Sequence, residues 1–281
     1  CHFFTSRLKP RVVRMYLPII STYMLEPDSH QEWEKQIPAS MKRRDPRIWQ
    51  MAWFAAQEAI EKAGCQPRSV IVATALGALD ETCRYLDNVF ATGFGSPKNF
   101  IASVHNSMAG KLAMAFSVQG PNLTMCEGQN SFASALIAAS LLTPHDFPTL
   151  LLSVDENIGI LQDVHPHLSD DCRPWLSEGW QDCAIAFVLG AADDQVAKPA
   201  LSAAGICPVD RTTPPQEACI SLVQNRGWQT DRLLPLSETS VSFISPAKCA
   251  YSKFMEKISG TTLIGSYSPS SSGAAVTALC Q

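Results

Sequence analysis

The chain has 281 residues, of which 46% are hydrophobic, 17% charged and 8% aromatic, and these fractions exclude a disordered or collagen-like protein. The 22 basic and 26 acidic residues give a net charge of -4, and the only dense basic run is the short stretch Met41–Arg44. A nucleic-acid-binding protein would need a basic stripe, so no nucleic acid is expected as a partner.

The longest apolar segments, Ala133–Leu142 and Ala184–Ala192, fall short of the roughly 18 to 20 residues that span a bilayer, so no membrane span is expected. Lys9 and Arg11 interrupt any apolar signal core, which predicts a cytoplasmic protein without an export signal. We expect a single domain over 1–281, with residues 1–14 foreign to the native chain or poorly ordered and Met15 as the native start.

Ten cysteines are scattered along the chain without a CxxC motif or a repeated spacing. This pattern is typical of small buried side chains in a reducing cytosol, and not of a disulfide framework or a zinc site. We therefore expect neither a metal nor another cofactor.

The first part of the chain predicts a strand, a helix and a second strand. Val12–Met24 is apolar and β-branched, as an opening strand requires. Asp45 is a suitable N-cap for a helix with Pro46 at its first position and Gly64 just past its end. Val70–Ala75 predicts a buried strand. The next segments expected are a helix over Asp80–Phe90, a turn-rich loop over Gly93–Asn99 and a helix over Val104–Val118.

Strands and helices continue to alternate in the second part. The expected segments are a strand over Leu123–Cys126, an alanine-rich helix over Ser131–Leu142, strands over Thr149–Val154 and Cys183–Leu189 and, after a proline-broken region, strands over Thr261–Tyr267 and Ala274–Cys280. The βαβαβ order predicts a layered α/β fold in which helices cover a mixed sheet.

Gly120–Phe132 runs from a glycine-proline turn through a short strand into a helix. The segment resembles β-ketoacyl synthases of the thiolase fold. In that family a Gly-Pro-x-x-Thr strand leads to a catalytic cysteine nine residues after the glycine, at the foot of a buried helix whose N-terminus lowers the thiol pKa. Nine residues after Gly120 stands Gln129, so the nucleophile position holds an amide without nucleophilic chemistry.

Other segments resemble the same family in the same order. Val104–Gly110 is similar to its Asn-x-x-Ala-Gly helix, Val154–Glu156 to the strand end after the nucleophile helix, and Arg173–Gly179 to its Arg-Pro-Phe and glycine-rich segment. Gly265–Ala275 resembles its terminal turn. The resemblance is good over 70–189 and implies a thiolase-like layered fold with an abridged carboxy-terminal half.

Ketosynthases use two histidines in the second half of the domain, but no histidine follows His167 here. Glutamine at the nucleophile position is a feature of chain-length factors, and the chain most resembles the short chain-length factor of bacterial aryl polyene clusters. The resemblance implies a non-catalytic subunit that forms a heterodimer with a full-length ketosynthase. Through that complex it would meet acyl carrier protein and shape the acyl tunnel during aryl polyene, polyketide or fatty-acid-type elongation.

The resemblance also assigns positions to individual residues. The dimer interface would contain Leu123, Thr124, Met125 and Cys126, because the family pairs this strand with its mate across a dimer axis. The substrate tunnel would be lined by Phe90, Phe100, Ile101, Asn106 and Phe132. Ordinary core packing is the alternative for the apolar residues at 90, 100 and 101.

Other interpretations remain open at this point. Gln129 is compatible with a capping role at the start of a helix, with stabilisation of a malonyl-thioester enolate in a decarboxylase, or with an unrelated α/β binding protein. Cys126 is a second candidate nucleophile, although an unpaired cysteine on a strand is usually core. His165–His167, with Asp163, Asp170, Asp171 and Cys172, resembles a metal cluster in composition, but Pro166 and the polar surroundings favour a solvated loop.

Overall fold

The computed structural model describes residues 11–25, 30–167, 182–191, 199–208, 215–224, 233–235, 255, 261–266 and 273–280. Within them, nine strands form one mixed sheet in the order β3-β2-β4-β5-β1-β6-β9-β8-β7. The strands are β1 (Arg11–Leu25), β2 (Ser69–Ala73), β3 (Asn122–Met125), β4 (Thr149–Asp155), β5 (Cys183–Leu189), β6 (Ala200–Pro208), β7 (Leu233–Pro235), β8 (Thr261–Ser266) and β9 (Gly273–Cys280). The helices are α1 (His30–Gln36), α2 (Ala39–Arg44), α3 (Arg47–Ala63), α4 (Leu79–Thr92), α5 (Pro97–Ser103), α6 (Ser107–Ala115), α7 (Ser131–Ala139), α8 (Ile160–Val164) and α10 (Pro215–Gln224).

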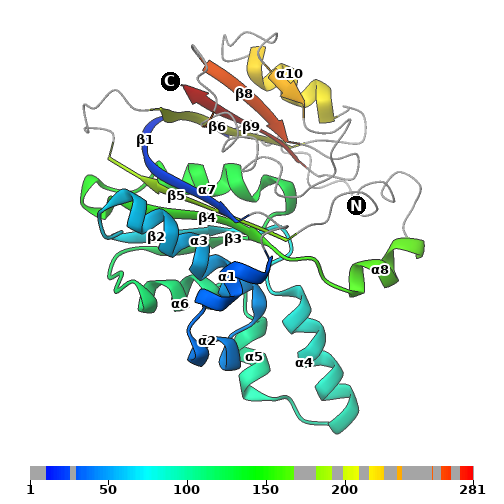
Figure 1. Ribbon diagram of the computed structural model, residues 1–281. Coiled ribbons are helices and arrows are strands. Elements are labelled where there is room, and N and C mark those ends of the chain that lie inside the picture. The colour runs from blue at the N-terminus through cyan, green and yellow to red at the C-terminus, as the bar shows by residue number, and fades with distance from the viewer. Residues whose placement is uncertain are drawn as a thin grey trace.

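The long strand β1 joins two halves of the sheet. Its residues 11–18 pair with β6 and its residues 19–25 pair with β5, both antiparallel, with an irregularity in each ladder. Figure 1 shows β1 curving from the upper group of strands into the lower one. The lower half continues through β4, β2 and β3, which run parallel to one another. This half contains the nucleophile-like turn.

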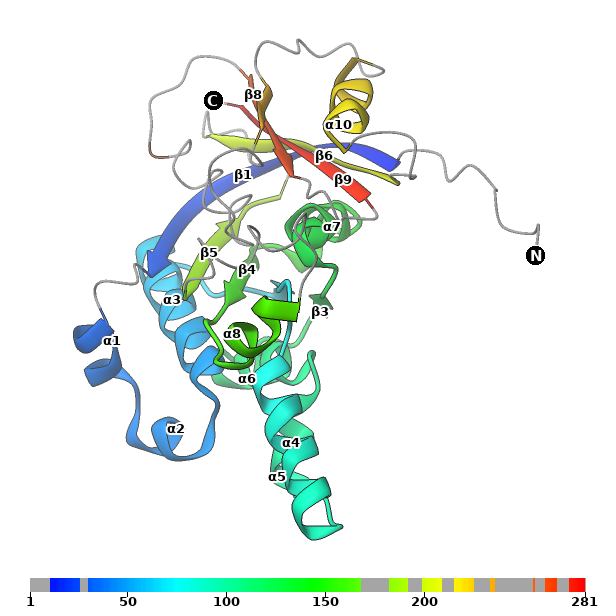
Figure 2. The same cartoon turned by 90° about the vertical axis from the view of Figure 1, so that its right-hand side faces the viewer.

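Helices cover both halves in layers. Helix α7 contacts β2, β3 and β4 on one side and β6 and β9 on the other, so it lies between the two halves (Figure 2). Helices α3 and α6 cover the outer face of the lower half, and α10 covers β6 and β9. The predicted layered α/β fold with helices around a mixed sheet is confirmed.

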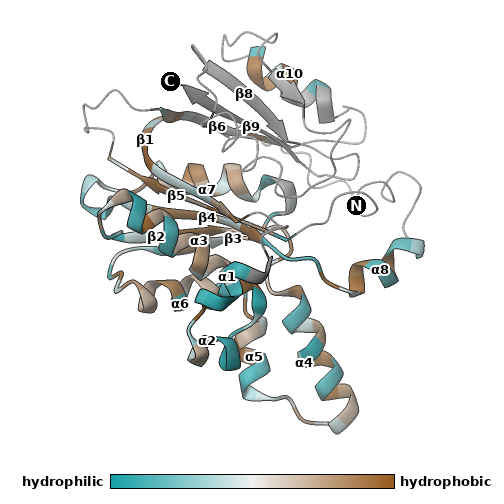
Figure 3. Cartoon of the chain, viewed as in Figure 1, coloured by the Kyte–Doolittle hydropathy of each residue, from teal (hydrophilic) through white to brown (hydrophobic). Residues whose placement is uncertain are grey.

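Strands β2, β4 and β5 are buried along their whole length, because successive side chains point to opposite sides of the sheet and both sides are covered. In β2, Ile71 faces the core around α7, whereas Val70 and Val72 face the core around α3 and α6. In β5, Phe187 lies in the first of these cores and Val188 in the second. Figure 3 colours these strands mostly as hydrophobic, in agreement with the long apolar runs in their sequence.

Several predicted boundaries were wrong. Helix α3 has Pro46 at its N-cap and not Asp45, because Asp45 is the C-cap of the unpredicted helix α2. The loop predicted over Gly93–Asn99 already turns helical at Pro97, where Ser96 caps α5 by accepting from Asn99 N at 3.4 Å. The helix predicted over Val104–Val118 is confined to α6.

The prolines of the last third mark element ends. Pro208 closes β6, Pro215 is the first residue of α10 and Pro235 closes β7. A proline at the first helical position loses no intrahelical hydrogen bond, so α10 tolerates it. The described part of the last third therefore contains a helix and two strands, β6 and β7, that the sequence pattern did not predict.

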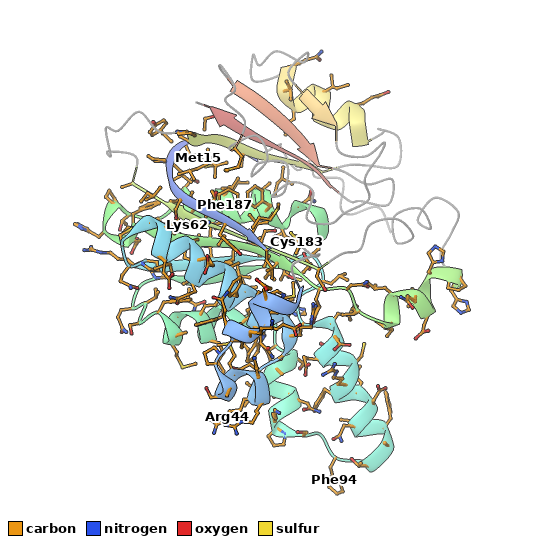
Figure 4. The ribbon with its side chains drawn as sticks, in the orientation of Figure 1. Met15, Arg44, Lys62, Phe94, Cys183 and Phe187 are labelled. Atoms are coloured by element: carbon orange, nitrogen blue, oxygen red, sulfur yellow. The ribbon has the colours of Figure 1, made fainter. Side chains whose placement is uncertain are left out.

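Helices α4 and α5 form a hairpin that projects from the body (Figures 1 and 2). Phe94, in the loop between the two helices, lies at the tip of the projection (Figure 4). Among the described residues, no helix combines the length and apolar character needed to cross a membrane.

Candidate functional site

Polar side chains gather where the parallel strands β2, β3 and β4 end. Parallel strands bring their carboxyl ends to one edge of a sheet, and the start of antiparallel β5 lies at the same edge because Cys183 pairs with Asp155. The first residues of α4 and α7 follow β2 and β3 directly. This edge is where helix N-termini and loops of α/β proteins usually form sites.

The turn that carries the nucleophile position is short and internally bonded. Gln129 is the middle residue of the 3-10 turn Gly128–Asn130, which leads into α7. Ser131 Oγ accepts from Glu127 N at 2.8 Å and lies 2.9 Å from the carbonyl oxygen of Thr74, to which it donates. Ser131 therefore ties the turn to the end of β2.

Asp155 is the buried acceptor at the centre of this edge. Its carboxylate accepts from Ala75 N at 2.9 Å, from Leu76 N at 3.2 Å and from Thr74 Oγ1 at 2.9 Å. Burial raises the pKa of Asp155 to about 6, and the three hydrogen bonds oppose that rise. The carboxylate therefore fixes the loop that connects β2 to α4.

Cys126 does not have the environment of a nucleophile. Its Sγ donates towards the carbonyl oxygen of Ala75 at 3.7 Å. Burial raises the pKa of the Cys126 thiol, and the nearby carboxylates of Asp155 and Glu127 raise it further. A thiol with a raised pKa carries little thiolate at neutral pH, so this arrangement supports a structural role.

Four carboxylates and two guanidinium groups form a charged cluster close to the buried carboxylate of Asp155. Arg47 pairs with Asp182 at 2.7 Å, and Arg84 pairs with Asp80 at 2.8 Å and with Glu81 at 3.2 Å. The remaining carboxylate belongs to Glu156, and burial raises its pKa to about 7. The negative charges of residues 80, 182 and 81 raise this pKa further, and the guanidinium of Arg47 opposes the rise. The cluster thus holds a carboxyl group that titrates near neutral pH.

We expect Glu156→Gln to stabilise the chain at pH 8 and to leave it nearly unchanged at pH 4. A carboxyl group whose pKa is higher in the folded chain than its ordinary value of 4.5 binds protons more tightly when folded. The protonated carboxyl therefore adds to the free energy of unfolding below pH 4.5, relative to the charged form. This stabilisation is lost as the pH rises through about 7, and the free energy of unfolding falls by about 3 kcal/mol at most. Urea unfolding at both pH values measures it.

The matched control is Glu32→Gln, which changes an exposed glutamate on α1. It should leave the pH dependence of the free energy of unfolding as it is in the wild type. An equal slope in wild type and Glu156→Gln would contradict the assignment.

Strand β3 is at the edge of the sheet. It pairs with β2 on one side, and no other described strand pairs with its outer side. Leu123, Thr124 and Met125 are half-buried, and the Oγ1 of Thr124 is buried without a described hydrogen-bond partner. Cys126 follows the strand immediately. The residues predicted for the dimer interface thus lie together on an open sheet edge.

The projecting hairpin carries three of the predicted tunnel residues. Phe90, near the end of α4, is 83% exposed, and Phe100 and Ile101 on α5 are 54% and 56% exposed. The ring of Phe100 lies 5.6 Å from that of Tyr85 across the hairpin. These exposed fractions exclude the ordinary-core alternative within the isolated chain.

The other two predicted tunnel residues lie elsewhere. Phe132 is buried on α7, with its ring 5.8 Å from that of Phe187. Asn106 is exposed at the N-cap of α6 and accepts from Gly110 N through its backbone carbonyl at 3.1 Å. The single chain therefore does not bring the five tunnel residues to one place.

The histidine pair near residue 165 forms a short 3-10 turn, His165–His167, after α8, and the exposure of residues 166 and 167 agrees with the solvated loop that Pro166 favours. In the part of the chain that the structure describes, no group of three His, Cys, Asp or Glu side chains could hold a metal ion. The acidic residues and the cysteine at 170–172 lie outside the described residues.

Sequence patterns missed the residues that organise this edge. Thr74 and Asp155 stand at the ends of continuous apolar strands, where a polar side chain signals that a strand leaves the core. His105 accepts from Ala78 N through Nδ1 at 3.1 Å across 27 residues of sequence, and no local signal reveals that contact.

Comparisons with solved structures support the fold. The chain is similar to the ishigamide ketosynthase/chain length factor, with a TM-score of 0.68, 13% identity, and coverage of 95% of this chain and 98% of that one. It is also similar to the ketosynthase ApeO in complex with its chain length factor ApeC from Xenorhabdus doucetiae, with a TM-score of 0.62, 15% identity, and coverage of 94% and 99%.

The chain is similar as well to 3-oxoacyl-(acyl carrier protein) synthase III, FabH, from Pseudomonas aeruginosa, with a TM-score of 0.52, 16% identity, and coverage of 96% of this chain and 98% of that one. No curated protein matches the chain. At these identities the structures establish the thiolase-like fold alone.

The family model of the beta-ketoacyl synthase N-terminal domain matches residues 21–223. The matched residues include the ends of β2, β3 and β4, the turn Gly128–Asn130 that contains Gln129, and the α4–α5 hairpin. The match shows that the chain belongs to the beta-ketoacyl synthase family.

Proposed function

We propose that this chain is a catalytically inactive, chain-length-factor-like subunit of a condensing enzyme. It forms a heterodimer with an active, full-length ketosynthase, and it shapes the acyl tunnel in which a chain grows on acyl carrier protein. The observation that carries the proposal is Gln129, an amide at the nucleophile position beside α7 in a member of this family. The absence of any histidine after His167 supports it.

The chemistry of the site agrees with this role. A condensing enzyme needs a thiolate and groups that polarise the thioester carbonyl. At the nucleophile position this chain has neither a thiol nor a titratable group, and the nearby thiol of Cys126 has a raised pKa. The proposed role is therefore to complete the partner's cavity and not to react.

Two surfaces are suited to the ketosynthase. No strand among the described residues pairs with the outer side of β3, so this side is suited to a partner strand, and such an edge otherwise promotes aggregation. The hairpin exposes Phe90, Phe100 and Ile101, and contiguous exposed apolar side chains usually mark an interaction site. We propose that both surfaces face the same ketosynthase and that residues 1–281 act as one ketosynthase-like domain in the cytoplasm.

Aryl polyene formation is the proposed pathway, since the short, glutamine-bearing chain resembles chain-length factors of that class. Co-expression with a full-length ketosynthase from the same source, followed by purification and native mass measurement, tests the pairing. A one-to-one complex is expected. A stable monomer that ignores the ketosynthase would favour an unrelated α/β binding protein.

Gln129→Cys is expected not to create an efficient condensing enzyme. The new thiol would stand at the start of a helix, but the chain has no histidine after residue 167 to polarise the thioester or assist decarboxylation. Acyl loading, condensation and malonyl decarboxylation are measured for wild type and variant without the ketosynthase. Turnover by either protein would contradict the non-catalytic role, and wild-type decarboxylation that Gln129→Ala removes would establish a decarboxylase.

A further inference from the structure

The loop before α4 gives all of its free backbone N–H groups to side chains. Asp155 and Thr74 accept the N–H groups of residues 75, 76 and 77. The next N–H, that of Ala78, donates to Nδ1 of His105 at 3.1 Å. Ala78 is the N-cap residue of α4, and a helix start leaves such groups without partners inside the helix. His105 thus supplies an acceptor that the helix cannot provide.

His105 contacts this amide from the segment that follows the second helix of the hairpin. It lies in the turn between α5 and α6, whereas Ala78 precedes α4, so the contact closes the base of the α4–α5 hairpin. Thr82 supports the closure, because its Oγ1 lies 2.9 Å from the carbonyl oxygen of Ala78 and 3.5 Å from that of Ser103. The start of α4 is therefore fastened to the end of α5 at the base of the hairpin.

The backbone is shaped to admit the imidazole ring. Gly77 has a φ of +62°, a left-handed conformation that glycine adopts without cost. A Cβ at this position would overlap the ring atoms Nδ1, Cε1 and Cγ of His105. The ring consequently lies directly against the loop, and its Nδ1 accepts while Nε2 carries the ring proton.

We propose that His105 is a positioning residue, which fixes the direction in which the α4–α5 hairpin leaves the body and therefore where Phe100 and Ile101 stand. Helix α4 begins and helix α5 ends at a clasp formed by Ala78, Thr82, Ser103 and His105. This inference rests on the proposed function. In the complex, the clasp determines how the exposed residues of α5 meet the ketosynthase and hence the length of the product.

Two substitutions separate the acceptor from the shape of the side chain. His105→Leu keeps a branched side chain but has no acceptor. His105→Asn restores one, because its Oδ1 stands the same number of bonds from the backbone as Nδ1. His145→Leu, at an exposed histidine in the 3-10 turn Pro144–Asp146, is the matched control. Amide hydrogen exchange is followed over residues 75–104 of the full chain, both alone and with the ketosynthase, and product lengths are measured by mass spectrometry.

In His105→Leu we expect exchange at Ala78 and the hairpin base to rise about tenfold, which corresponds to about 1.4 kcal/mol for the lost hydrogen bond. The product distribution should broaden in the same variant. His105→Asn should return both readouts towards wild type, and His145→Leu should change neither.

Unchanged exchange in His105→Leu would overturn the clasp. Faster exchange with an unchanged product distribution would overturn the positioning role. A chain that forms no active complex with the ketosynthase would contradict the proposed function instead, while the exchange measurement on the chain alone still decides whether His105 holds the hairpin.

Discussion

Thr124→Pro is expected to abolish the association of this chain with its ketosynthase while leaving the chain folded. The direction of the backbone groups in β3 is the reason. Pro121 O accepts from Val70 N at 2.9 Å, and Met125 O accepts from Thr74 N at 3.0 Å, so the backbone groups of residues 121 and 125 face β2. Since backbone groups alternate sides along a strand, those of Thr124 face the open edge.

A proline at 124 therefore removes a donor that β2 does not use. The ladder between β2 and β3 keeps its hydrogen bonds, but a partner strand meets a ring in place of an N–H group. We expect a loss of about 3 kcal/mol or more, which weakens binding at least a hundredfold. Native mass measurement and a binding titration with the purified ketosynthase quantify the loss.

Two controls make the result specific to the edge. Thr124→Val keeps the backbone donor and replaces a buried hydroxyl that has no described partner, so it should still associate. Met125→Pro removes an N–H that faces β2 and should destabilise the chain itself. Association that survives Thr124→Pro at wild-type affinity would show that β3 is not the docking strand.

The strands of the lower half could be predicted because their burial leaves a strong pattern. Both faces of β2, β4 and β5 are covered, so apolar residues dominate all three strands, and Ser69 and Thr149 mark the starts of β2 and β4. The Gly-Pro turn and the strand after it also placed Gln129 correctly at the foot of α7. Here local sequence and tertiary burial specify the same structure.

The short helices could not be predicted from local pattern. A helix of seven residues such as α1 is not stable by itself, and tertiary contacts hold it. Trp33 is 2% exposed, its ring lies 6.0 Å from that of Phe54, and the guanidinium of Arg47 stands 5.9 Å from it. For α5 the signal was present, since Ser96 and Pro97 form a cap and a first helical position, but the neighbouring glycines suggested a loop.

The candidate site was predictable in position and not in detail. Family resemblance marked the strand ends and the glutamine, whereas the groups that Asp155 holds at this edge lie 79 to 81 residues away in sequence, as Thr74 does. Such long-range pairs leave no periodicity in either segment. The exposure of Phe100 was likewise hidden, because an apolar residue on a helix reads the same whether its own core or a partner covers it.

Phe100→Ala in the complex is expected to lengthen the products without unfolding this chain. At 54% exposure, its side chain contributes far less to stability than a buried phenylalanine, whose loss would cost roughly 3 to 5 kcal/mol. If α5 closes the far end of the partner's tunnel, the removed volume admits additional two-carbon units. Ile101→Trp adds volume at the neighbouring position, which is 56% exposed, and should shorten the products.

Phe94→Ala provides the matched control, because Phe94 is 80% exposed at the tip of the same hairpin and outside the segment assigned to the tunnel (Figure 4). Product lengths are measured by mass spectrometry, and thermal melts of each complex verify folding. We expect opposite shifts for the substitutions at 100 and 101 and no shift for the one at 94, since Phe94 is not among the residues that the proposal assigns to the tunnel. The same length distribution in all folded variants would mean that the exposed residues of α5 bind the partner's surface and do not limit its tunnel.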